Sequence, residues 1–225
     1  MSLKFIASES SRYMQWDELS NLGIKHCFTT YPEDMGVKTN NDKSNLIQNY
    51  DKAKAFATLN SKQTYFAQQI HDKNIGIINS LTDGTEFFLG RYLDNTDGLI
   101  TSIPDITLIT QYADCTPITL WDTKNKVLAS VHSGWKGTSL KIIESAITDM
   151  ISNYDSKPSD IHCFIWPSIG YDDFEVDEDV AKIFRSSSLS ATTWAWLATT
   201  NKLDNGSKPF CFVSIGFKLS KTSFK

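Results

Sequence analysis

Three segments of the sequence each place a metal-binding or nucleophilic side chain at the end of a β-rich run. These side chains are His71, Cys115 and His132. Two imidazoles and one thiolate form a three-ligand zinc set that leaves a fourth position for water. Because zinc lowers the pKa of that water from about 15.7 to about 7, this stoichiometry indicates a catalytic site rather than a structural one. Taken singly, the same residues could equally be packing residues.

His132 also begins a turn in which a strand runs into two glycines and a lysine before an amphipathic helix. Gly134 and Gly137 would let the backbone approach an oxyanion, and Lys136 would add a positive charge. The turn is not a P-loop, because GxxxxGK[ST] is absent. A tight turn with glycine at positive φ and Trp135 in the core explains the same residues, so both interpretations are open.

Two acids stand beside these segments and are suited to proton transfer. Asp114 precedes Cys115, and Asp97 lies in a Thr-Asp-Gly sequence before another β-rich run. Either acid could donate a proton or bind a ribose hydroxyl. Neighbouring residues of a strand point to opposite faces, so Asp114 could instead cap a turn or orient His71.

The composition predicts one globular domain and excludes several classes of protein. The 225 residues are 40% hydrophobic, enough for one sizeable core, and a net charge of -4 argues against nucleic acid as the main partner. No apolar run approaches the ~20 residues that span a bilayer, and no signal-peptide core is present, so we expect a cytoplasmic protein without a membrane partner. Four histidines are too few for a multicopper oxidase, which needs roughly ten imidazoles.

The four cysteines are far apart in the sequence and form no CxxC pair, which argues against a disulfide framework. His26 and Cys27 near the N-terminus, and His162 and Cys163 in a later β-rich run, are expected to be packing residues of buried strands.

Short β-rich runs alternate with a few helices, which predicts an α+β fold: a single domain with a mixed β-sheet core flanked by helices. Helices are expected at about 44–59, after Gly137 through Ile151, and at 176–184. Strands are expected at His26–Thr30, Tyr65–Ile70, Ile75–Asn79, Gly98–Thr101, Ile106–Tyr112, Ile118–Trp121, Val127–His132 and Ile161–Trp166.

From Ser186 onward the composition changes, because five lysines stand against a single acid. We therefore divide the chain into a domain at 1–185 and an atypical C-terminal tail at 186–225, which is either an ordinary divergent end or an altered one. Within the tail, the apolar stretch from Phe210 to Phe217 could form a strand.

Five motifs together resemble the laccase-domain family, also called the multicopper polyphenol oxidoreductase family. The resemblance covers roughly residues 20–185, and its most specific parts are the Ala-Asp-Cys and His-Ser-Gly-Trp-Lys-Gly motifs. The motifs are, in order, Gln69-Ile70-His71, Thr96–Thr101, Ala113–Ile118, Val131–Gly137, and Pro167–Gly170 with Phe174–Val176.

The resemblance implies a zinc enzyme that phosphorolyses adenosine, inosine, guanosine and methylthioadenosine to free base and ribose 1-phosphate, and that deaminates adenosine. Purine nucleosides and phosphate would be its partners. His71, Cys115 and His132 match the family's zinc ligands. The expected catalytic residues are Cys115, His132 and Asp114, and the expected substrate-binding or phosphate-binding residues are Gln69, Gly134, Lys136 and Gly137.

The family fold is similar to the catalytic domain of cytotoxic necrotizing factor toxins, which is a Cys-His deamidase. A metal-independent thiol hydrolase or deamidase, in which His132 activates Cys115, is therefore the alternative function. Copper could also occupy a mixed nitrogen and sulfur site in vitro, but copper redox chemistry needs more ligands than these.

The chain departs from the family pattern at several positions. No arginine follows Phe28-Thr29-Thr30, Trp166 replaces the glycine before Pro-Ser, and Lys136 replaces an arginine. Lysine cannot reproduce the two-pronged grip of arginine on phosphate. The family's C-terminal Cys-Thr pair and arginine-rich stretch have no counterpart after Phe184, so an inactive purine-binding remnant is a further hypothesis.

Overall fold

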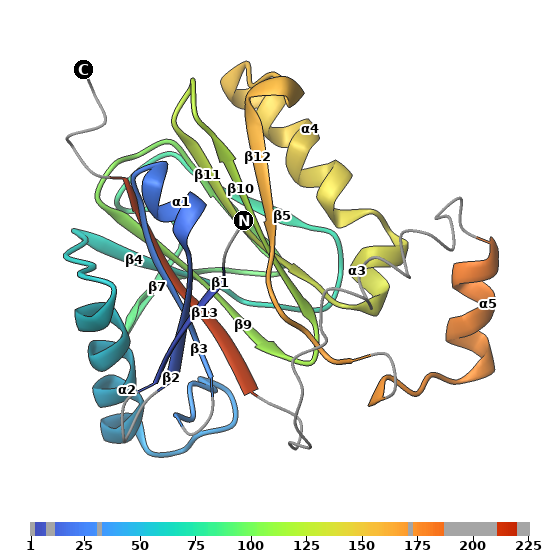
Figure 1. Cartoon of the computed structure of the whole chain (residues 1–225), viewed down its shortest axis with the longest axis horizontal. Helices are drawn as coiled ribbons and strands as arrows, with labels where there is room; N and C mark the ends of the chain where they lie inside the picture. Colours follow the sequence, from blue (N-terminus) through green and yellow to red (C-terminus); the bar gives the residue numbers. More distant parts are fainter. Residues whose placement is uncertain (1–2, 8–11, 31–32, 171–172, 187–210, 220–225) are drawn as a thin grey trace.

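The fold is built on two mixed β-sheets, seen in a computed structural model that describes residues 3–7, 12–30, 33–170, 173–186 and 211–219 (Figure 1). The larger sheet contains, in spatial order, β1 (Leu3–Ala7), β2 (Arg12–Trp16), β3 (Ile24–Thr29), β13 (Cys211–Leu219), β9 (Ile106–Ala113), β4 (Gln63–Ala67), β7 (Gly90–Leu93) and β6 (Thr85–Phe87). The smaller sheet contains β12 (Ile161–Ile165), β10 (Thr116–Asp122), β11 (Val127–Ser133), β8 (Gly98–Thr101) and β5 (Ile75–Ile78).

Most strand pairs are antiparallel, but β4 runs parallel to β7 and β9, and β5 runs parallel to β8. The described helices are α1 (Asp17–Asn21), α2 (Lys43–Phe56), α3 (Trp135–Ser139), α4 (Ile142–Tyr154) and α5 (Glu178–Ser186), together with a short 3-10 turn at Pro158–Asp160. The expected α+β single domain with a mixed sheet core is confirmed.

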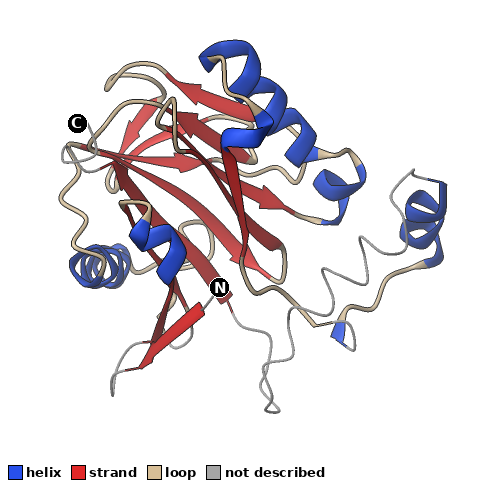
Figure 2. Cartoon of the chain, turned by 45° about the horizontal axis from the view of Figure 1, so that its top comes forward, coloured by secondary structure: helices blue, strands red, loops and turns tan. Residues whose placement is uncertain are grey.

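The core has an apolar layer between the two sheets and one further layer under each of two helices. Residues of both sheets, such as Phe28 and Leu108 on one side and Trp121 on the other, pack together in the central layer. Helix α2 lies against the larger sheet and α4 against the smaller one (Figure 2). Helix α4 packs through Ile142 and other apolar side chains. The sheets are thereby packed face to face.

Helix α2 forms where the sequence predicts it and ends slightly earlier. Asp42 caps its N-terminus by accepting a hydrogen bond from the Asn45 amide at 3.0 Å. Leu46, Tyr50 and Ala53 recur at helical spacing and are fully buried. The helix ends at Phe56, three residues before the predicted end at 59.

The helix expected after Gly137 is confirmed as α4, but it begins later than predicted, at Ile142, and a separate short helix, α3, precedes it. Lys141 adopts a left-handed conformation with φ of 62° and separates the two helices. Helix α3 therefore has only five residues, and the apolar stripe that predicted one helix belongs mainly to α4.

Of the four residues expected to pack in buried strands, two are buried and two are exposed. His26 and Cys27 in β3 are fully buried, as predicted. His162 and Cys163 are exposed, because β12 lies at the edge of the smaller sheet and, among the described strands, pairs with β10 alone. The β-branched pattern around them predicted a strand correctly but could not tell an edge strand from a central one.

The strand expected at Phe210–Phe217 is confirmed as β13, which lies between β3 and β9 in the middle of the larger sheet. The rest of the predicted tail from 187 to 210, and 220–225, lies outside the described residues. The division of the chain at residue 185 stays a prediction. No helix among the described residues is long and apolar enough to cross a membrane.

His26 holds the end of β2 against β3 as a neutral imidazole. Its Nε2 accepts a hydrogen bond from the Trp16 amide at 2.9 Å, and its Nδ1 donates to the Ile24 carbonyl at 2.9 Å. Burial lowers the pKa of His26 from 6.5 to about 4, although the hydrogen bond to Ile24 opposes the shift.

We therefore expect folding stability to depend on His26 at acid pH. The unfolded chain binds a proton at His26 below pH 6.5 and the folded chain does not, so stability falls as the pH drops from 6.5 to about 4. The loss is of the order of 3 kcal/mol, and His26→Gln should remove this part of the pH dependence. Urea unfolding across this range measures it; the exposed His162→Gln is the control, and a flat native profile would contradict the account.

Candidate metal centre

His71, Cys115 and His132 come together where the ends of the two sheets meet. His71 follows β4 of the larger sheet, Cys115 lies between β9 and β10, and His132 lies in β11 of the smaller sheet. One ligand atom from each residue lies within 4.8 Å of the other two. The two imidazole rings are nearly perpendicular, with centroids 4.8 Å apart. Residues from three distant parts of the sequence thus form one cluster, open at His71 and buried at His132.

Two residues of this cluster's segments have unusual backbone angles. His71 has a φ of 60° and Asp114, next to Cys115, has a φ of 78°. Positive φ is uncommon outside glycine and is often found at functional sites, where the surrounding structure must hold it. At Asp114 it turns the chain from β9 in the larger sheet to β10 in the smaller one.

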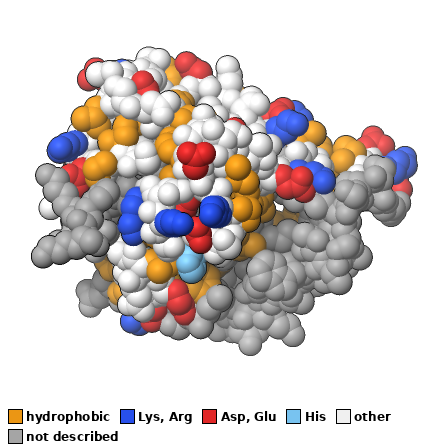
Figure 3. All heavy atoms as spheres, turned by 90° about the horizontal axis from the view of Figure 1, so that it is seen from above, with side chains coloured by type: hydrophobic (Ala, Val, Ile, Leu, Met, Phe, Trp, Pro, Cys, Tyr) orange, Lys and Arg blue, Asp and Glu red, His pale blue; other side chains and the backbone are white. Residues whose placement is uncertain are grey.

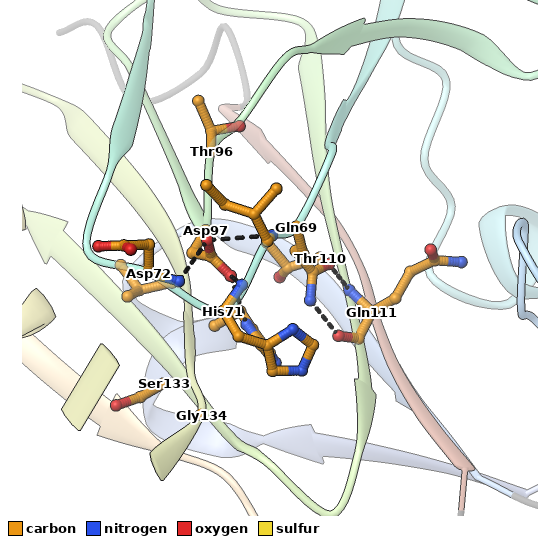
Figure 4. Close-up of polar contacts among 12 residues, drawn as sticks. Gln69, His71, Asp72, Thr96, Asp97, Thr110, Gln111, Ser133 and Gly134 are labelled. Atoms are coloured by element: carbon orange, nitrogen blue, oxygen red, sulfur yellow. Dashed lines mark hydrogen bonds and ion pairs between the residues drawn. The ribbon is translucent and has the colours of Figure 1, made fainter. Parts of the chain in front are cut away.

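The buried carboxylate of Asp97 holds both histidine segments (Figure 4). Its Oδ1 accepts from the His71 amide at 2.8 Å and lies 2.9 Å from Nδ1 of His132. Its Oδ2 accepts from the amides of Ile70 at 3.2 Å and Asp72 at 2.9 Å. Burial acts to raise the pKa of Asp97, but these hydrogen bonds outweigh it and lower the pKa. Sequence reasoning noted Asp97 as an acid, but not this bridging position.

Gln69 attaches the segment that carries His71 to the neighbouring strand β9. Its Nε2 donates to the Gln111 carbonyl at 2.6 Å, and its Oε1 accepts from the Gln111 amide at 2.7 Å (Figure 4). The side chain thus imitates a strand partner for β9. The expected contact of Gln69 with substrate stays a prediction, and the contacts observed here are structural.

The glycines of the turn are needed for close approach rather than for positive φ. A Cβ at Gly134 would lie 3.2 Å from Cδ2 of His71 and 3.3 Å from Sγ of Cys115, and the φ of Gly134 is -71°. A Cβ at Gly137 would lie 2.9 Å from the Asp72 carbonyl oxygen. Trp135 is 38% exposed, so the alternative of a positive-φ turn with Trp135 in the core is wrong.

Lys136 is exposed and paired with an acid instead of lying free. Its Nζ is 2.6 Å from Oδ2 of Asp72. A second lysine, Lys38, donates to the Gln69 carbonyl at 3.0 Å, and its charge lowers the pKa of His71. Sequence reasoning missed Lys38, because it lies in a polar loop without a motif. Figure 3 shows a histidine at the surface with basic and acidic side chains around it.

The electrostatics of the cluster favour uncharged ligands in the absence of a cation. Burial, followed by the charges of Asp114 and Asp97, raises the pKa of Cys115 to about 11. Burial and then repulsion from His132 lower the pKa of His71, against the attraction of Asp97. Burial also raises the pKa of Asp114. A bound cation would offset the cost of the buried thiolate.

The donor set fits a metal ion. Nδ1 of His132 is hydrogen-bonded to Asp97, so Nε2 is the ring nitrogen that remains for a metal ion. The same arrangement is found in carboxylate–histidine–metal triads. Gly134 leaves room beside Cys115 and His71 that a Cβ would fill. One thiolate with two imidazoles suits zinc and copper alike, so the geometry does not choose between them.

Trp166, which replaces the expected glycine, is buried in the core between the sheets and is not part of the metal-binding cluster. It is 1% exposed, stacks on Phe28 with centroids 5.3 Å apart, and donates from Nε1 to Thr119 Oγ1 at 3.0 Å. This departure from the family pattern is therefore compatible with the fold.

A family model described as "Multi-copper polyphenol oxidoreductase laccase" matches residues 29–210. The chain belongs to this family. It is 29% identical over 178 residues to a protein from Deinococcus radiodurans named purine nucleoside phosphorylase, an alignment covering 75% of this chain and 66% of that protein. It is 26% identical over 159 residues to purine nucleoside phosphorylase YlmD of Bacillus subtilis, covering 69% and 56%.

Two solved structures share the fold. The hypothetical protein YfiH of Bacillus licheniformis superposes with a TM-score of 0.73 at 25% identity, covering 97% of this chain and 81% of that chain. YlmD of Geobacillus stearothermophilus superposes with a TM-score of 0.75 at 18% identity, covering 96% and 100%. The chain spans between about a third and two thirds of the length of the first curated relatives that it matches.

We expect Gly134→Ala to weaken metal binding while leaving the fold intact. The new methyl group would press on the His71 ring and the Cys115 sulfur, and the φ of -71° tolerates alanine. Zinc affinity, measured by chelator competition, should fall about tenfold or more. Gly170→Ala is the control, because its Cβ meets Asp173 only at an ordinary 3.5 Å. Unchanged affinity in the Gly134 variant would contradict this geometry.

Proposed function

We propose that this chain is a zinc-dependent purine nucleoside phosphorylase that converts a purine nucleoside and phosphate into free base and ribose 1-phosphate. The observation that carries the proposal is the cluster of His71, Cys115 and His132, in a chain whose curated relatives bear the name of this enzyme. Adenosine, inosine, guanosine and methylthioadenosine are the proposed substrates. Deamination of adenosine is a second proposed activity of the same site.

Asp114 is the residue that we assign to protonate the departing purine. A bound zinc ion would supply a Lewis acid and a water of lowered pKa. Asp114 immediately precedes Cys115 in the short connection between β9 and β10. Burial raises its pKa, so Asp114 keeps a proton to higher pH than an exposed aspartate does.

Phosphate is proposed to bind between the glycine turn and the two lysines. Lys136 and Lys38 supply the positive charge. The turn that contains Gly134 and Gly137 is proposed to line the same site, and the two glycines let it lie close to His71 and Asp72. Phosphate would compete with Asp72 for the Lys136 ammonium. Helix α3 is too short to add a substantial dipole, so the side-chain charges must do most of this binding.

Product analysis of the full chain with adenosine tests the proposed function. We expect free adenine only when phosphate is present, and complete loss of this product in Cys115→Ala because the cluster loses its sulfur ligand. Cys163→Ala removes an exposed thiol elsewhere and is the matched control. Inosine alone would support only the deaminase activity. No product from folded, zinc-loaded chain would contradict the proposal and favour a purine-binding remnant.

Asp114→Asn should reduce turnover by about 10²–10⁴-fold with little change in folding, because the amide keeps the shape but cannot donate the proton. Steady-state kinetics with inosine and phosphate measure the effect. Asp149→Asn is the matched control, since burial also raises the pKa of Asp149, which lies on α4. Equal turnover in the Asp114 variant and the native chain would remove Asp114 from the mechanism.

A thiol hydrolase is the second candidate, because the His132 ring lies between Cys115 and Asp97, as the histidine does in a Cys-His-Asp triad. Two observations weigh against it. The raised pKa of Cys115 keeps it a thiol without a cation, and His71 would have no role. Activity that resists chelators and is lost on alkylation of Cys115 would favour the hydrolase, whereas inhibition by a chelator that zinc reverses would favour the phosphorylase.

A further inference from the structure

The carboxylate of Asp97 has four nitrogen partners and binds two segments of the cluster without belonging to the proposed ligand set. Three partners are main-chain amides of residues 70–72, which can only donate. The fourth is Nδ1 of His132. Asp97 is 0% exposed and precedes β8 of the smaller sheet, whereas residues 70–72 follow β4 of the larger sheet. One buried group therefore connects the elements that carry two of the three ligands.

We propose that Asp97 is the positioning residue of the metal centre, and that it acts by fixing the proton of His132 on Nδ1 and by holding His71 in its left-handed conformation. The inference rests on the metal site of the proposed function, but not on its reaction. It assigns no contact between Asp97 and the metal or the substrate.

The first part of this role follows from the hydrogen-bonding capacity of a carboxylate, which accepts and cannot donate when ionised. Nδ1 of His132, at 2.9 Å from Oδ1, must then carry the hydrogen of a neutral imidazole. Nε2 keeps its lone pair for a metal ion. Tyr112 packs against the same ring with centroids 5.5 Å apart, so the ring cannot turn freely to exchange its nitrogens.

The second part follows from the backbone of His71. Its φ of 60° is unfavourable for a residue other than glycine, and such conformations persist only where surrounding contacts hold them. Asp97 supplies these contacts by binding the amide of His71 and the amides on either side. The same oxygen, Oδ1, binds both the His71 amide and the His132 ring, so a displacement of one histidine is transmitted to the other.

Asp97→Asn is a sharp test, because the amide group cannot satisfy all four partners. If its NH₂ replaces Oδ2, it faces the amide hydrogens of Ile70 and Asp72. If it replaces Oδ1, it faces the His71 amide and forces Nδ1 of His132 to accept, which moves the hydrogen to Nε2 and blocks coordination. Either arrangement disturbs a ligand.

We expect Asp97→Asn to lower zinc affinity about 10–100-fold in chelator competition. Asp122→Asn is the matched control: Asp122 is also fully buried and accepts two turn amides, from Lys124 at 2.8 Å and Asn125 at 2.9 Å, away from the cluster. A merely structural carboxylate would give both variants the same result, so zinc affinity within twofold of the native chain in the Asp97 variant would overturn the proposal.

A second measurement uses the native, metal-free chain and does not depend on the variant folding. Two-bond ¹H–¹⁵N correlation spectra of histidine-labelled protein distinguish the two tautomers of His132, with His132→Gln used for assignment. The proposal requires hydrogen on Nδ1 and a bare Nε2, and hydrogen on Nε2 would overturn it. Both tests are independent of turnover, so a chain that binds zinc through this arrangement without phosphorolysis would refute the proposed function alone.

Discussion

The site depends on one buried carboxylate that joins two sheets. Asp97 binds the segment after β4 and the ring of His132 in β11, and its own carbonyl oxygen accepts from the His132 amide at 2.7 Å. A buried charge is stable only when hydrogen bonds replace its hydration, and here the replacements are the groups that carry the cluster. The geometry of His71 and His132 and the burial of Asp97 are thus consequences of the same set of contacts.

The rest of the fold serves to bring these strand ends together. The apolar layer between the sheets fixes their spacing, and the left-handed residue Asp114 leads the chain from one sheet to the other just before Cys115. The glycines at 134 and 137 then let α3 lie directly against residues 71 and 72. The positive φ of His71 is held by the hydrogen bonds of Asp97, and the positive φ of Asp114 turns the chain from one sheet to the other.

Much of the architecture could be predicted from the sequence, because alternating apolar residues mark strands and helical spacing marks α2 and α4. The cluster could be proposed because His71, Cys115 and His132 each follow or end a β-rich run. The sequence could not show that Lys141 separates α3 from α4, since left-handed lysine has no sequence signal. It also could not show that β12 is an edge strand, since edge position depends on pairing. The role of Asp97 also escaped prediction, because it arises from contacts between residues 25 to 35 positions apart.

X-ray absorption spectroscopy of the zinc-loaded full chain tests the central claim most directly. The account predicts one sulfur ligand at about 2.3 Å and two imidazole nitrogens at about 2.0–2.1 Å, with a further light atom in the open position. Loss of the sulfur contribution in Cys115→Ala would assign it to that residue. A zinc shell of oxygen and nitrogen alone in the native chain would contradict the account, because the cluster would then not be the metal centre.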